Sequence, residues 1–185
     1  MSRRAAKKWF AGIFASLLVV GASEAVHAQE DDDRLLKAAF VFNFATFTTW
    51  PNAALPEADD VITLCLAGSD KLFEPLNRLA GKRVHDRRLL VRAVPGNEAL
   101  EGCAILYVAL SQRENMHLAL ESAASKPILS ISELPSFAIR GGIVELYQED
   151  QRIRFRINLA AAEESGLTLS SRLLRLAEIV GGGMQ

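Results

Sequence analysis

Several features that mark specialised proteins are scarce in this chain of 185 residues. It has two cysteines, too few for a disulfide-dense scaffold or for a zinc site made of cysteine alone. Twelve glycines and six prolines are too few for a fibrous or low-complexity chain. Basic and acidic residues nearly balance, at 21 and 22, which argues against nucleic acid as the partner. No apolar run reaches the roughly 20 residues that span a bilayer.

The composition itself is that of a globular protein. Half of the residues are hydrophobic and 23% are charged, which excludes a wholly disordered chain. The length suits one ordinary domain. Because there is no internal repeat and no linker-like segment, we predict a single domain after the N-terminal leader described next.

The first 28 residues have the layout of a secretory signal peptide. Basic side chains at positions 3, 4, 7 and 8 precede an uncharged, mostly apolar run, Trp9–Gly21, and the small-residue ending Val26-His27-Ala28 follows. We predict cleavage after Ala28, a mature domain of residues 29–185 and a periplasmic location; an uncleaved anchor is the alternative. The arginine pair leaves open whether export is by the Sec or the twin-arginine route.

Export decides how the two cysteines are interpreted. Cys65 and Cys103 each lie in an apolar, strand-like run. Two cysteines in an oxidising compartment favour a disulfide between them. The alternative is a pair of buried free thiols.

Hydrophobic runs that alternate with helical patterns predict an α/β fold. We expect a mostly parallel sheet flanked by helices, with a C-terminal antiparallel hairpin at its edge. The expected strands are 61–67, 88–94, 103–108, 128–131, 143–147 and 152–157. The first expected helix begins near Asp31–Asp33. The others cover 70–79, 114–125, 159–165 and 170–180; Asn158 is expected to cap the helix over 159–165, and Ser170 or Ser171 the last one.

Two groups of side chains are candidates for binding a partner. The first is an aromatic segment, Phe40–Pro51, in which Phe42 and Trp50 lie off the helical face that the other aromatics share. Burial in the core is the alternative for both.

The second group is basic. Arg152, Arg154 and Arg156 alternate with apolar residues and therefore share one face of the last predicted strand. They could grip an acidic partner or pair with Glu145 across the hairpin. Arg172, on the last predicted helix, is a further candidate.

Little in the sequence points to an enzyme. The predicted mature chain has two histidines, His85 and His117, and neither has a partner at a metal-ligand spacing. The Gly-x-Ser-x-Gly and His-Glu-x-x-His patterns are absent. We expect no catalytic activity, metal or cofactor. A sensor that binds a small ligand in a crevice near Ser69 and Ser111 is an alternative function.

Three stretches together resemble the YfiR family of periplasmic regulatory proteins. They are Lys37–Phe44 running to Trp50-Pro51, Gly102–Tyr107, and Arg152–Ala161 followed by Gly166-Leu167 and Ser170–Ala177. The resemblance covers nearly all of the mature chain. It implies an α/β sandwich that forms homodimers and represses an inner-membrane diguanylate cyclase by binding its periplasmic domain, so that cyclic-di-GMP and biofilm formation stay low.

The resemblance also implies redox or envelope-stress release of that repression, and an outer-membrane lipoprotein that sequesters the repressor. Cys65 and Cys103 match a cysteine pair of the family. Some members carry a second disulfide in the region of residues 141–152, where this chain has no cysteine.

Overall fold

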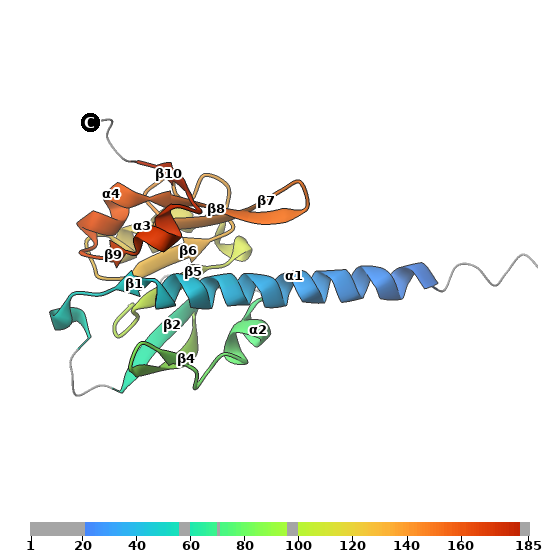
Figure 1. Ribbon diagram of the computed structural model, residues 1–185, viewed down its shortest axis with the longest axis horizontal. Helices are drawn as coiled ribbons and strands as arrows, with labels where there is room; N and C mark the ends of the chain where they lie inside the picture. The colour runs from blue at the N-terminus through green and yellow to red at the C-terminus, as the bar shows by residue number, and fades with distance from the viewer. Residues whose placement is uncertain (1–20, 56–59, 70, 96–99, 182–185) are drawn as a thin grey trace, which may run out of the picture. The chain divides into compact units, whose positions relative to one another are not determined.

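The computed structural model describes residues 21–55, 60–69, 71–95 and 100–181; for residues 21–30 it describes the helical backbone alone. The chain divides into two compact units, Met1–Asp33 and Arg34–Gln185. The second unit has the fold described below (Figure 1). The helices are α1 (Gly21–Thr46), η1 (Asn52–Ala54), α2 (Phe73–Asn77), η2 (Leu110–Gln112), α3 (Met116–Ala123), α4 (Leu159–Glu164) and α5 (Ser171–Leu174). The strands are β1 (Thr48–Thr49), β2 (Val61–Ala67), β3 (Arg83–Val84), β4 (Arg87–Val94), β5 (Ile105–Val108), β6 (Leu129–Ser132), β7 (Val144–Glu149), β8 (Arg152–Asn158), β9 (Thr168–Leu169) and β10 (Glu178–Val180).

One large sheet has the strand order β10-β8-β7-β6-β5-β2-β4-β3. The neighbours from β4 to β7 run parallel, whereas β3 is antiparallel to β4 and β8 is antiparallel to β7. The α/β class is confirmed, but the sheet is mixed rather than mostly parallel. The expected hairpin is present as β7 and β8; it does not form the edge, because β10 pairs in parallel with β8.

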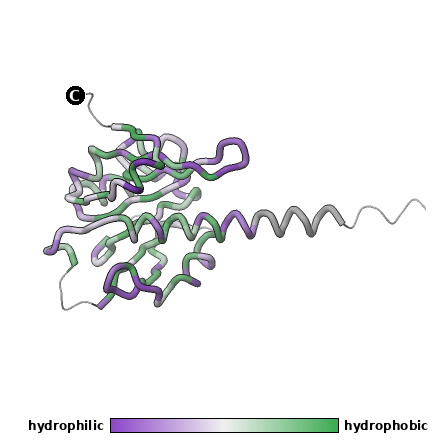
Figure 2. Tube along the Cα trace, in the orientation of Figure 1, coloured by the Kyte–Doolittle hydropathy of each residue, from purple (hydrophilic) through white to green (hydrophobic). Residues whose placement is uncertain are grey.

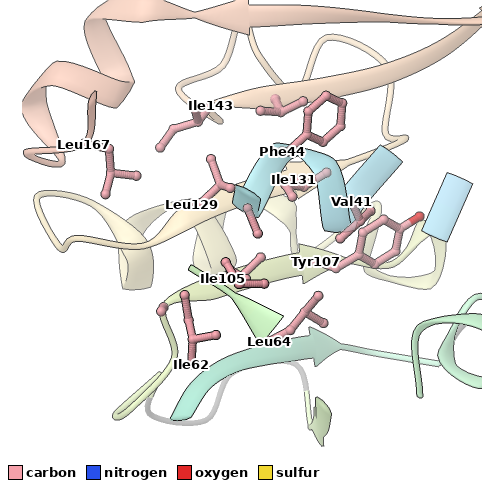
Figure 3. Packing of buried hydrophobic residues seen from close by; sticks show 14 of the residues in the cluster. Val41, Phe44, Ile62, Leu64, Ile105, Tyr107, Leu129, Ile131, Ile143 and Leu167 are labelled. Atoms are coloured by element: carbon pink, nitrogen blue, oxygen red, sulfur yellow. The ribbon is translucent and has the colours of Figure 1, made fainter. Parts of the chain in front are cut away.

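The core lies on both faces of this sheet, since side chains alternate along each strand. On one face, helix α1 packs Val41 and Phe44 among residues of the central strands such as Ile105 and Tyr107 (Figure 3). On the other face, Met116, Ala119 and Ala123 of α3 pack against the alternate residues of β2 and β5. Strands buried on both sides explain the continuous apolar runs in the sequence.

Helix α1 begins at Gly21, before the predicted start at Asp31–Asp33. Residues 22–30 are mostly good helix formers without proline, and nothing there stops a helix. Residues 1–20, most of the predicted leader, lie outside the described residues. Within the described residues, no helix is long and apolar enough to cross a membrane.

The C-terminal segment differs from the predicted helix over 170–180. Ser170 caps α5 as predicted, with its Oγ accepting from the Leu173 amide at 3.3 Å. The helix ends at Leu174, and β10 follows. The β-branched pair Ile179-Val180 favours a strand, and β8 offers it a free edge, so tertiary pairing outweighs the helical pattern. The cap predicted at Asn158 is also present.

Candidate functional site

The hairpin of β7 and β8 carries the basic residues that the sequence singled out. In its register, Glu145 lies opposite Arg156 and Tyr147 opposite Arg154. The tip of the hairpin is hydrophilic (Figure 2). We call Arg152, Arg154 and Glu149, all exposed near this tip, the hairpin surface.

Arg156 is held by neighbouring side chains, with 27% of its own side chain exposed. Its Nη1 donates to Glu145 Oε1 at 3.1 Å, its Nε donates to Glu178 Oε2 at 2.9 Å, and its guanidinium lies 4.1 Å from the centre of the Tyr147 ring. The hydrogen bond to Glu178 raises the pKa of Arg156, and the bond from Arg156 lowers the pKa of Glu178. Burial, followed by the hydrogen bond to Glu178, raises the pKa of Tyr147. Arg156 therefore joins β7, β8 and β10.

Protonation of Glu178 is expected to loosen β10. A carboxyl group with a lowered pKa contributes stability above its unfolded-state pKa, about 4.3, and this contribution is lost as the pH falls through the folded-state pKa. Acidification from pH 6 to 3 should therefore lower the protection factors of the β10 amides, which are exchange rates corrected for the intrinsic rate at each pH, before the global transition. Glu178→Gln should lower the same protection factors at pH 6; if the β10 amides are equally protected in both proteins at that pH, this role of Glu178 is wrong.

Arg154 is the more accessible arginine. Its Nε lies 3.0 Å from Glu149 Oε2, and about half of each side chain is exposed, at 51% and 53%. Exposed ion pairs of this kind contribute little to stability. Arg154 can therefore leave Glu149 for a partner at small cost.

The two aromatic candidates are placed differently from the hairpin surface. Trp50 is 6% exposed, and its Nε1 donates to the Ala104 carbonyl oxygen at 3.1 Å. Phe42 is partly buried against the core, with Lys82 Nζ 5.9 Å from its ring centre. Trp50 is therefore a core residue, whereas part of the Phe42 ring is accessible to solvent.

Arg172 lies exposed on α5, which follows β9. Strand β9 pairs with β1, next to Trp50 in the chain. The candidates thus lie on separate elements: Arg154 and Arg156 on the hairpin, Phe42 on α1, Trp50 after β1, and Arg172 on α5.

The predicted disulfide between Cys65 and Cys103 is present, with the two Cα atoms 5.8 Å apart. It joins β2 to the segment that leads into β5. Arg92 of β4 reaches both sulfurs: its Nη2 lies 3.3 Å from Cys103 Sγ and 3.5 Å from Cys65 Sγ, and donates to the Glu101 carbonyl oxygen at 3.0 Å. The bridge and its arginine lie on the face of the sheet opposite α1.

The ends of the strands near Ser69 and Ser111 were predicted as an alternative binding site for a small ligand. A hydrogen bond joins these two residues. Ser111 Oγ accepts from the Ser69 amide at 3.0 Å. A side chain at Gly68 would lie 2.7 Å from Ser111 and Gln112, and φ there is +89°, so glycine is required for this close approach. Among the described residues, no group of three acidic, histidine or cysteine side chains could hold a metal.

Sequence reasoning missed two features of these sites. Glu145 is 2% exposed and accepts from the Ser136 and Ala138 amides as well as from Arg156. The sequence left open whether the arginines of this strand pair with Glu145 or bind an acidic partner. It could not show that Glu145 also accepts backbone amides, because these belong to the connection between β6 and β7. The contact of Arg92 with the disulfide depends on the pairing of β2 with β4, in which Arg92 lies opposite Cys65.

The fold and these surfaces define an α/β domain that presents a charged hairpin and a single internal disulfide. Residues 34–178 match the family model described as YfiR/HmsC-like. The chain belongs to this family, as the resemblance of its sequence predicted. The family is regulatory and non-catalytic.

Proposed function

We propose that this protein is a periplasmic repressor that binds the periplasmic domain of an inner-membrane diguanylate cyclase and lowers cyclic-di-GMP and biofilm formation. Membership of the YfiR/HmsC-like family over residues 34–178 carries this proposal. The internal disulfide fits an oxidising compartment. We extend the proposal to removal of residues 1–28 on export, to a homodimer, and to sequestration by an outer-membrane lipoprotein.

A repressor must bind the inactive conformation of its target better than the active one, because equal binding shifts nothing. A 100-fold change in the ratio of the two conformations requires a difference of about 2.7 kcal/mol in binding free energy. We assign part of this difference to the hairpin surface, where Arg154 is accessible and weakly held. Phe42 and Arg172 are candidates for a second contact; Trp50 and Arg156 would act by holding the fold.

Deletion of the gene should raise cellular cyclic-di-GMP when the cyclase is present. Complementation with Arg154→Glu should restore less repression than the wild type, because reversed charge at a central contact typically costs about 2 kcal/mol or more. Arg113→Glu, at an exposed arginine that lies on none of the elements carrying the candidates, is the matched control and should repress fully. Cyclic-di-GMP is measured alongside the amount and intact mass of the exported protein, which should begin at Gln29.

The outcomes separate the interface from the function. Full repression by Arg154→Glu would remove the hairpin surface from the interface. Unchanged cyclic-di-GMP after deletion of the whole gene, with the cyclase present and active, would defeat the regulatory function itself.

A further inference from the structure

One short stretch of the chain concentrates positive charge. Residues 71–92, which include α2, β3 and most of β4, contain seven basic and two acidic side chains. The other residues of the chain contain 14 basic and 20 acidic side chains, so the charges are separated in space along the chain although they nearly balance in total. The trace over β3 and its connection to β4 is largely hydrophilic (Figure 2). The proposed contact of the hairpin surface with a cyclase does not use this segment.

Four of these basic side chains come from the edge of the large sheet, where β3 is the outermost strand, and from the segment that leads into it. All four are exposed: Arg78 after α2, Lys82 before β3, Arg83 on β3 and Arg88 on β4. We call these four residues the basic edge. Within the described part of the chain, none of them forms an ion pair with a carboxylate. Their charges are therefore available to an anion outside the fold.

Two members of the basic edge oppose each other directly. In the antiparallel pairing of β3 with β4, Arg83 lies opposite Arg88, so both side chains lie on the same face of the sheet. Like charges directly opposite each other on two strands destabilise the pair. Arg83 donates to the Asp86 carbonyl oxygen of its own turn, which does not neutralise its charge. An arrangement that costs stability is better explained by the binding of external anions than by a role in folding.

Apolar side chains beside these charges favour a lipid surface as the source of the anions. Leu90 lies two residues beyond Arg88, on the same face of β4, and is 47% exposed. Lys82 Nζ lies 5.9 Å from the centre of the partly buried Phe42 ring. Basic side chains next to accessible apolar ones are typical of proteins that rest on the headgroup region of a bilayer. Anionic lipids can also move beneath each charge, whereas an acidic protein must offer carboxylates at fixed, matching positions.

We propose that the basic edge docks this protein onto the anionic surface of a phospholipid bilayer. The proposal rests on the proposed periplasmic location, which places the phospholipids of the cell envelope within reach. Each lysine or arginine near an anionic membrane surface increases the affinity about fivefold, which corresponds to about 1 kcal/mol. Four such charges give a reversible attachment that weakens as salt screens the charges. This attachment concentrates the protein beside a target that is embedded in the membrane.

The test is sedimentation of the mature exported protein with vesicles of phosphatidylglycerol and phosphatidylethanolamine in equal parts, at low salt. The protein should bind these vesicles, be released by sodium chloride, and not bind vesicles of phosphatidylcholine alone. Arg83→Gln combined with Arg88→Gln should weaken binding about 25-fold, because two of the four charges are lost. Arg113→Gln combined with Arg140→Gln is the matched control. Both of these arginines are exposed and lie outside the basic edge, so the net charge changes equally and binding should match the wild type.

Urea unfolding shows whether the variant keeps its fold. Removal of two opposed like charges should leave the Arg83, Arg88 double variant at least as stable as the wild type. Equal weakening of vesicle binding in the control variant would overturn the proposal, because general net charge would then explain the binding. Equal binding of the wild type to both kinds of vesicle, or to neither, would also overturn it.

Two further outcomes would assign the basic edge to another anion and overturn the proposal. One is release from the vesicles by inorganic phosphate at an ionic strength at which sodium chloride releases nothing, which would indicate a site for free phosphate. The other is reduced repression in cells by the Arg83, Arg88 double variant with wild-type vesicle binding, which would indicate an acidic protein. Vesicle binding is measured without a cyclase, so its failure is distinguishable from failure of the proposed repression, which the cyclic-di-GMP of the deletion strain reports.

Discussion

Replacement of Cys65 and Cys103 by alanine is expected to lower the free energy of unfolding by about 2–5 kcal/mol. The bridge closes a sequence separation of 38 residues, for which the chain-entropy account gives about 4 kcal/mol. The bridge also holds the start of β5 against β2 in the middle of the sheet. The midpoint of urea unfolding measures the loss.

The double alanine variant avoids a free thiol that could pair with another chain. Wild-type protein unfolded in dithiothreitol is the control and should lose a similar amount, because it lacks the same constraint. An unchanged midpoint in the variant, with the bridge shown to be formed in the wild type by mass mapping, would contradict a stabilising role.

Glu145→Ala is expected to cost about 3–5 kcal/mol, because it removes a buried carboxylate, breaks its partly buried ion pair with Arg156 and leaves buried polar groups unpaired. The Glu145 carboxylate accepts the Ser136 amide at 3.2 Å, the Ala138 amide at 3.1 Å and Arg156 Nη1 at 3.1 Å. Its removal therefore frees two backbone donors in the β6–β7 connection and weakens the link between β7 and β8.

Glu149→Ala provides a matched control within the same strand. Glu149 also pairs with an arginine of β8, but that pair is about half exposed and its loss should cost less than about 1 kcal/mol. Urea unfolding of both variants measures the difference. Equal losses would show that burial and the backbone bonds of Glu145 do not set its contribution.

Local patterns in the sequence predicted much of the fold. The apolar run Val61–Ala67 forms β2 over those residues, and Asn158 caps α4 as its residue type indicates. The segment that became β10 was misjudged, because Glu178 is held by Arg156 and Tyr147, both distant in sequence. A helical pattern could not reveal that β8 has an unpaired edge.

The candidate site was harder to predict for the same reason. Alternation along β8 placed three arginines on one face, but it did not show that Arg156 is committed to Glu145 and Glu178 while Arg154 stays exposed. The prediction that Trp50 lies off the buried face of a helix was based on a helix that reaches this residue. The helix ends at Thr46, and the Trp50 indole points into the core. Side-chain access depends on which strands become neighbours.

The order of strands around the disulfide also constrains oxidative folding. Strand β2 lies between β4 and β5, yet both follow it in the chain, so the edge of β2 that will receive β5 stays open until residue 105 and its neighbours have arrived. An open apolar edge invites pairing with another chain. With two cysteines in the whole sequence, one pairing within the chain exists, and every wrong disulfide must join two molecules. Dilution, rather than disulfide isomerisation, should therefore control the yield of oxidative refolding.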